Sequence, residues 1–141
     1  MSERTCYFAY GSNLDTTQMA WRCPDAIPVG RVRLPGWRLI MNRYGLATIV
    51  PDPDATAWGG LWRITPRCER ALDAYESIDT GLYVRRELEV LDDHDDAVTA
   101  LVYLATESRP GRASTGYLDG ITAGARDFAL PQGYLRDVVA S

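Results

Sequence analysis

The sequence predicts an α+β fold in which a small, mostly antiparallel sheet closes, or nearly closes, into a barrel with flanking helices. Short apolar and β-branched runs are separated by turns rich in Gly, Pro and Asp. Helical segments are interspersed among them without the alternating βαβ rhythm of a parallel sheet. The chain has 141 residues with no internal repeat and no low-complexity linker, which predicts one domain over residues 1–141.

The first expected element is a buried strand that runs into a tight turn and then a short helix. Thr5 to Tyr10 is aromatic and apolar, and Gly11-Ser12-Asn13 ends this run. Asp15 to Arg22 can form the helix, with Asn13 or Asp15 as its N-cap. The expected order is therefore strand, tight loop, helix.

A group of strands is expected between residues 27 and 64. The turn signals that separate them are Pro35-Gly36, Tyr44-Gly45 and Pro51-Asp52-Pro53-Asp54. In the last strand, Trp58, Gly60, Trp62 and Ile64 share one face because side chains alternate. The four expected strands are Val29–Leu34, Trp37–Asn42, Leu46–Val50 and Trp58–Ile64.

The next segment carries the strongest helix signal. Thr65 followed by Pro66 is a typical helix start. Cys68, Ala71, Leu72 and Tyr75 then recur at i, i+3, i+4 and i+7, which indicates one inward face. This helix is expected to end near Glu76, before Gly81.

A hairpin and a last large helix complete the prediction. Leu82–Leu91 and Val98–Ala105 are the expected strands, joined by the acidic segment Asp92–Asp96. That segment contains His94 but lacks the Gly and the distal Glu of a calcium loop, so we interpret it as a solvated turn. Ser114 can cap a helix over Thr115–Phe128, and Pro131 starts a short final helix. The inward side chains expected in the larger helix are Leu118, Ile121, Ala125 and Phe128.

Composition excludes several classes of function. A net charge of −4 has the wrong sign for a nucleic-acid binder. The absence of Lys excludes Schiff-base chemistry and pyridoxal phosphate attachment, and the single His94 leaves little room for a His-based metal site or a Ser–His relay. Pyridoxal phosphate and a His-based metal centre are therefore not expected.

Two further patterns bear on where the protein works. No apolar run approaches the roughly 18 residues that a membrane-spanning helix needs, so no membrane association is expected. Cys6, Cys23 and Cys68 are odd in number and lack CxxC spacing, and polar residues follow Met1. We therefore expect unpaired thiols in a reducing cytoplasm.

Two segments are candidates for chemistry. In Tyr10-Gly11-Ser12-Asn13-Leu14, backbone N–H groups at the strand-to-helix turn could hold an anion or an oxyanion, although an ordinary capped turn explains the same residues. Glu76 lies on the flank of the inward face, where burial and the helix dipole would raise its pKa toward neutrality. The alternative is a solvated glutamate at a fraying helix end.

Taken together, these motifs resemble those of the γ-glutamylcyclotransferase family over nearly the whole chain. The motifs are Tyr7-Phe8-Ala9-Tyr10-Gly11-Ser12-Asn13-Leu14, Gly45-Leu46-Ala47-Thr48-Ile49 with Ala57-Trp58-Gly59-Gly60-Leu61-Trp62, Leu72-Asp73-Ala74-Tyr75-Glu76 with Tyr83, and Ser114-Thr115-Gly116-Tyr117 with 124–131. Ala113 stands where the family commonly has proline, and Ala129 where it has glycine.

The resemblance implies a small mixed β-barrel without metal or organic cofactor. It implies an enzyme that cyclises a γ-glutamyl group to 5-oxoproline and releases an amine or amino acid. Glu76 would be the catalytic base and acid. The substrate-binding residues it implies are Tyr7, Phe8, Ala9, Tyr10, Gly11, Ser12, Asn13, Tyr83 and Tyr117.

Several alternatives stay open on sequence grounds. The substrate could be a γ-glutamyl amino acid, a γ-glutamyl amine or a protected amine of a biosynthetic pathway. A non-catalytic module on the same fold could bind an acidic small molecule, and a small interaction domain would need no pocket. The protein could be a monomer or a homodimer.

Overall fold

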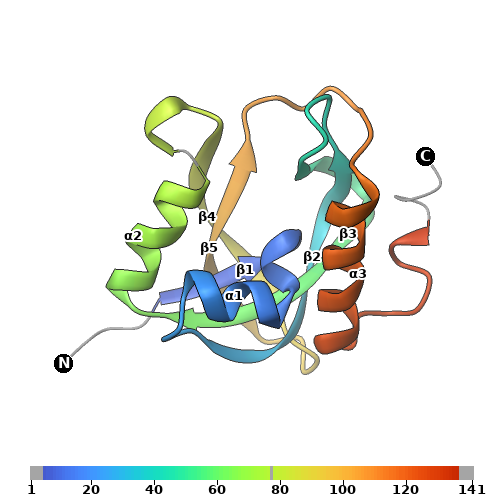
Figure 1. Ribbon diagram of the computed structural model, residues 1–141. Coiled ribbons are helices and arrows are strands. Elements are labelled where there is room, and N and C mark those ends of the chain that lie inside the picture. The colour runs from blue at the N-terminus through green and yellow to red at the C-terminus, as the bar shows by residue number, and fades with distance from the viewer. Residues whose placement is uncertain (1–4, 77, 137–141) are drawn as a thin grey trace.

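The structure is a computed structural model that describes residues 5–76 and 78–136. Five strands close into a barrel in the order β1-β3-β2-β4-β5 (Figure 1), which confirms the predicted closed sheet. The strands are β1 (Thr5–Ala9), β2 (Ile27–Met41), β3 (Ala47–Ile64), β4 (Tyr83–Leu91) and β5 (Ala97–Ala105). Neighbouring strands are antiparallel except β1 and β5, which pair in parallel through Tyr7 and Leu101 and so make the barrel mixed.

The prediction of four separate strands between residues 27 and 64 was wrong. The structure has one long hairpin, β2 with β3, whose tip lies at the expected Tyr44-Gly45 turn. Pro35 pairs with Thr56 and Trp37 pairs with Pro51, so residues 52–55 lie opposite Gly36 alone. The expected turns at Pro35-Gly36 and at 51–54 therefore lie opposite each other, where they form one irregularity in the β2–β3 pairing. Bulged residues of this kind bend a strand without ending it, and they accommodate Pro and positive-φ Gly.

Three α-helices and two short 3-10 turns accompany the barrel within the described residues. They are η1 (Ser12–Leu14), α1 (Thr16–Arg22), α2 (Pro66–Tyr75), η2 (Ile78–Thr80) and α3 (Thr115–Asp127). In Figure 1, α2 and α3 lie on opposite sides of the barrel and α1 lies between them. Of the two N-caps expected for α1, the structure selects Asp15, which accepts from the Thr17 N–H at 3.0 Å. The expected helix start at Thr65-Pro66 is confirmed, with Thr65 as the N-cap, and so is the expected cap Ser114.

The helix faces agree with the prediction only in part. Cys68 and Leu72 of α2 are buried, but Ala71 is exposed and Tyr75 is 46% exposed. Tyr75 lies at the last turn, where the helix ends at the rim of a cavity. In α3, Ile121 is buried, and Phe128 directly after the helix packs edge-on against Trp62 at a centroid distance of 5.4 Å. Where a final helix was expected from Pro131, residues 132–135 form turns and Arg136 is helical, and the rest of that prediction lies outside the described residues.

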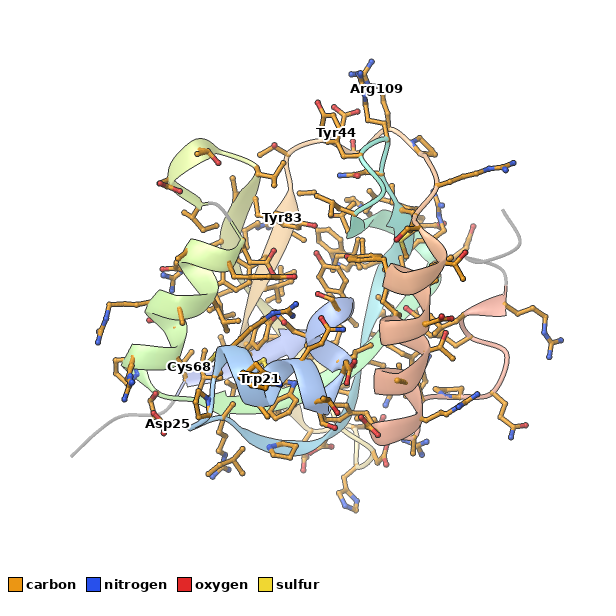
Figure 2. The ribbon with its side chains drawn as sticks, viewed as in Figure 1. Trp21, Asp25, Tyr44, Cys68, Tyr83 and Arg109 are labelled. Carbon is orange, nitrogen blue, oxygen red and sulfur yellow. A yellow bond between two sulfur atoms is a disulfide. The ribbon has the colours of Figure 1, made fainter. Side chains whose placement is uncertain are left out.

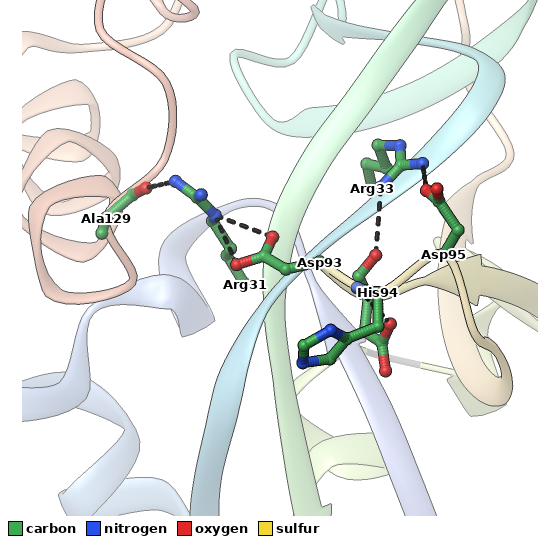
Figure 3. Close-up of polar contacts among 7 residues, drawn as sticks. Arg31, Arg33, Asp93, His94, Asp95 and Ala129 are labelled. Carbon is green, nitrogen blue, oxygen red and sulfur yellow. Dashed lines mark hydrogen bonds and ion pairs between the residues drawn. The ribbon is translucent and has the colours of Figure 1, made fainter.

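The acidic segment forms the tip of the β4–β5 hairpin, as predicted. Asp92 caps the turn by accepting from the N–H groups of His94 and Asp96. Arg31 and Arg33 of β2 reach across to the tip, where they pair with Asp93 and Asp95 (Figure 3). No group of three or more potential metal ligands occurs among the described residues. The carboxylates are therefore used for turn formation and ion pairing.

The expectation of three unpaired thiols was wrong. Cys23, at the C-terminal end of α1, forms a disulfide with Cys68 in the first turn of α2, visible as the sulfur bond beside Cys68 in Figure 2. Cys6 is free. Sequence spacing could not indicate this pair, because 45 residues separate the two cysteines and only the packing of α1 against α2 brings them together.

Candidate active site

A cavity of about 220 Å³ opens between the loop after β1, the C-terminal end of α2 and helix α3. Six of its described lining residues are tyrosines, and Glu76 is the one carboxylic acid among them. The lining residues are Tyr7, Tyr10, Gly11, Ser12, Asn13, Leu46, Ala47, Tyr75, Glu76, Leu82, Tyr83, Tyr103 and Tyr117. The cavity therefore combines one carboxyl group with several phenolic hydroxyls and one stretch of backbone.

The loop after β1 presents its backbone to this cavity. Gly11 and Ser12 accept hydrogen bonds through their carbonyls, from Leu14 N at 3.0 Å and from Asp15 N at 3.1 Å. In such a turn the carbonyls point along the helix axis, and the N–H groups of its first residues have no partner within the turn. A β-carbon on Gly11 would lie 3.1 Å from the Ala47 Cβ, so the loop packs tightly against the start of β3.

Glu76 lies at the end of α2, where it is the C-cap residue and its own N–H bonds the Leu72 carbonyl at 2.8 Å. Burial raises the pKa of Glu76 from 4.5 to about 7, and the nearby Arg22 guanidinium opposes this rise. The raised pKa predicted from sequence is therefore confirmed, with burial as the first cause. A carboxyl with a pKa near neutrality can both accept and return a proton.

Four pocket tyrosines differ in where their hydroxyl protons go. Tyr10 donates to the Tyr103 carbonyl, and Tyr83 donates to the Ala47 carbonyl at 2.8 Å. Tyr117 instead accepts from Ala47 N at 3.0 Å, and Tyr7 accepts from the Asn13 side chain at 2.9 Å. Tyr7 and Tyr117 therefore retain a proton that they can donate into the cavity.

Four of the pocket tyrosines, namely Tyr7, Tyr10, Tyr83 and Tyr117, stay neutral at physiological pH because their pKa values are raised. Burial raises the pKa of Tyr7, Tyr10 and Tyr83, and it raises the pKa of Tyr117 to about 12. Burial disfavours a phenolate, and the nearby Glu76 acts in the same direction on all four. The hydroxyls can therefore serve as hydrogen-bond donors and acceptors, but not as bases.

Two of the residues implied by the resemblance do not line the cavity. Phe8 and Ala9 are 0% and 1% exposed and lie in the core. Phe8 packs close to Gly59, where an added β-carbon would lie 2.5 Å from its ring. Side chains alternate along β1, so Tyr7 reaches the cavity while its neighbour Phe8 packs elsewhere.

Sequence reasoning missed other lining residues. Tyr103 comes from β5, and its hydroxyl donates to Asp73 at 2.6 Å. A tyrosine within the apolar run Val98–Ala105 was the available signal, because a buried hydroxyl needs a polar partner. Leu46, Ala47 and Leu82 carry no such signal, since small and apolar side chains are typical of any core.

Comparisons with known proteins agree with this geometry. The sequence pattern of the AIG2-like family matches residues 56–138. A γ-glutamylcyclotransferase of Mus musculus is 32% identical, with 94% of this chain and 76% of the relative covered, and the one of Homo sapiens is 31% identical with the same coverage. A solved structure of a γ-glutamyl cyclotransferase is 30% identical, with a TM-score of 0.90, 98% of this chain and 88% of that chain covered.

The closed barrel, the pocket and these relatives define an enzyme of the γ-glutamylcyclotransferase type. This confirms the fold and the type of function that the sequence resemblance implied. The chain belongs to the AIG2-like family.

Proposed function

We propose that this enzyme cyclises a γ-glutamyl compound to 5-oxoproline, with Glu76 as the proton-transfer group. The α-amine of the substrate attacks its own γ-carbonyl, so a C–N bond forms and closes the five-membered ring. The original γ-carbonyl C–N bond breaks, and the protons lost by the α-nitrogen go to the departing nitrogen. The substrate supplies the nucleophile, and the protein supplies proton transfer, orientation and charge stabilisation.

The observation that carries this proposal is the raised pKa of Glu76, about 7, in a cavity lined by hydrogen-bond donors. As a carboxylate it would take a proton from the substrate's α-ammonium group. The resulting carboxylic acid would protonate the departing nitrogen. One residue would then act as base and as acid in successive steps.

The donors around Glu76 suit the negative charges of this reaction. A γ-glutamyl substrate has an α-carboxylate, and the γ-carbonyl oxygen becomes negative during attack. The N–H groups of the loop around Gly11 and the free protons of Tyr7 and Tyr117 would stabilise these two charges. The hydroxyls of Tyr10 and Tyr83, which donate to carbonyls, would shape the cavity and accept from the substrate.

The test is a panel of γ-glutamyl amino acids and γ-glutamyl amines, with 5-oxoproline measured by mass spectrometry. We expect product from the wild type and from Glu87→Gln, which changes an exposed glutamate of β4. Glu76→Gln should give little product. A wild-type protein that forms no 5-oxoproline from any compound, yet binds one of them, would support the non-catalytic binding module instead.

We also propose that the protein works in the cytoplasm as a monomer or homodimer. No helix among the described residues is long and apolar enough to cross a membrane. In a reducing compartment the Cys23–Cys68 bond should be open in most molecules. Alkylation after acid quenching of cells should then count three free thiols, whereas a single free thiol would indicate an oxidising compartment.

A further inference from the structure

Two branches of hydrogen bonds begin at Arg22 of α1, one leading to Asp15 and one leading to the cavity. The Gln18 amide donates to Asp15 at 3.1 Å, and its carbonyl oxygen accepts from Arg22 at 2.7 Å. Arg22 also donates to the Asn13 side-chain oxygen, and the Asn13 amide nitrogen donates to the Tyr7 hydroxyl at 2.9 Å. The branch from Arg22 through Asn13 ends at the Tyr7 hydroxyl, which lines the cavity, and the branch through Gln18 ends at the Asp15 carboxylate.

The orientation of Asn13 in this chain depends on Arg22. The two ends of an asparagine amide have nearly the same shape, so the hydrogen-bond partners decide which end faces which neighbour. A guanidinium can only donate, so it selects the Asn13 oxygen and leaves the nitrogen to face Tyr7. Because Tyr7 then accepts from Asn13, its own proton is free to be donated elsewhere.

Two contacts hold Arg22 itself in place beside the cavity. Its guanidinium carbon lies 3.8 Å from the centre of the ring of Tyr75, the residue that precedes Glu76 in the sequence. Its Nη1 lies 3.4 Å from the Ser12 hydroxyl in the loop after β1. Among the described residues no carboxylate lies within ion-pair distance of Arg22. Arg22 therefore links the loop to the end of α2 as an unpaired cation.

We propose that Arg22 is a positioning residue that, through Asn13, fixes Tyr7 as a hydrogen-bond donor to the substrate. This inference rests on the proposed function. It assigns no direct contact between Arg22 and substrate. It explains why a charged side chain that does not line the cavity is bound to two residues that do.

Asn13→Asp tests the proposal because it reverses hydrogen-bond polarity at nearly constant shape. A carboxylate only accepts, so the Tyr7 hydroxyl must donate to it and its proton is withdrawn from the cavity. The carboxylate would also pair with Arg22, so we expect an unchanged melting temperature. On the alkaline plateau of the rate, we expect a loss of about 10²-fold, the typical effect of removing one oxyanion donor. Tyr7→Phe should show the same loss.

Arg22→Met leaves the Asn13 amide free to adopt both orientations, so we expect a smaller loss of about tenfold, from the partial loss of one donor. The double variant Arg22→Met/Tyr7→Phe should be no slower than Tyr7→Phe alone, because both changes act through the same proton. Arg22→Lys keeps a charged group that only donates, and it should restore most of the activity. Arg38→Met, at a surface arginine paired with Asp52, is the matched control and should be fully active.

The pH profile gives a second readout. The other titratable groups that line the cavity with Glu76 are Tyr7, Tyr10, Tyr75, Tyr83, Tyr103 and Tyr117. Arg22 is the charged group that lowers the pKa of Glu76. Removing that cation should raise the pKa of Glu76, so the rising limb of the rate should move to higher pH in Arg22→Met and return in Arg22→Lys.

The outcomes separate the two proposals. An inactive wild type would refute the proposed cyclisation. An active wild type whose Asn13→Asp variant keeps full plateau activity, or whose Arg22→Met and Tyr7→Phe losses multiply, would refute the role of Arg22 alone.

Discussion

Replacing Glu76 by glutamine separates the charge of this residue from its shape. Glutamine has the same size and one accepting oxygen, but it cannot take a proton at neutral pH. We expect the rate to fall by about 10² to 10⁴, in the upper part of that range, because one group acts as both base and acid. Substrate binding should survive, since the hydrogen-bond donors of the cavity are unchanged.

The same substitution should stabilise the fold at neutral and alkaline pH. The folded protein raises the pKa of Glu76 from 4.5 to about 7, so it binds this proton more tightly than the unfolded chain does. Wild-type stability therefore falls as the pH rises from about 4.5 to about 7. Above that window the cost is on the order of 3 kcal/mol, because one pKa unit corresponds to 1.36 kcal/mol. Glu76→Gln does not have this cost.

The assay is urea unfolding at pH 4 and pH 8 for wild type, Glu76→Gln and the exposed control Glu87→Gln, with 5-oxoproline formation measured on the same preparations. Glu76→Gln should gain up to about 3 kcal/mol of unfolding free energy over wild type at pH 8, and nothing at pH 4. A variant of normal melting temperature that forms 5-oxoproline within a few-fold of wild type would refute the mechanism. Equal stability of the two proteins at pH 8 would refute the burial argument.

Three other predictions concern the loop, the disulfide and metals. Ser12→Ala should keep substantial activity in a steady-state assay. Gly11→Val should lose most of it, because even a single β-carbon at Gly11 would lie 3.1 Å from the Ala47 Cβ. If both variants were equally inactive, a covalent serine mechanism would be favoured. Under oxidising conditions, Cys68→Ser should lower the unfolding free energy by up to about 4 kcal/mol, the loop-closure effect of a bond across 45 residues, and a reductant should have that effect on wild type only. Activity should survive chelation, because the proposed reaction needs no Lewis acid; loss in a chelator with recovery on adding a divalent ion would contradict this.

Local patterns predicted most of the secondary structure because they depend on neighbouring residues. The Thr65-Pro66 start and the Ser114 cap place α2 and α3 correctly. The same local reading divided β2 and β3 into four strands, because Pro and Gly are ambiguous between a turn and a bulge. Only the pairing of Pro35 with Thr56 and of Trp37 with Pro51 shows which one is present.

The residues of the candidate site that belong to a short sequence motif were predictable. Those brought to the site by the packing of separate elements were less so. Glu76 and the loop around Gly11 come from short motifs, and the structure places both at one cavity. Arg22 has no such signal, because its partners Asn13 and Tyr75 lie on other elements. The disulfide was missed for the same reason.

The parallel pairing of β1 with β5 has a consequence for synthesis of the chain. The ribosome releases β1 first, and one edge of this aromatic strand stays open until β5 has been made. The Tyr10 hydroxyl and the Tyr7 ring both need Tyr103 of β5 as a partner. The nascent chain therefore holds an unprotected strand edge for most of its translation, and its cavity is complete only after β5 has closed the barrel and α3 has added Tyr117.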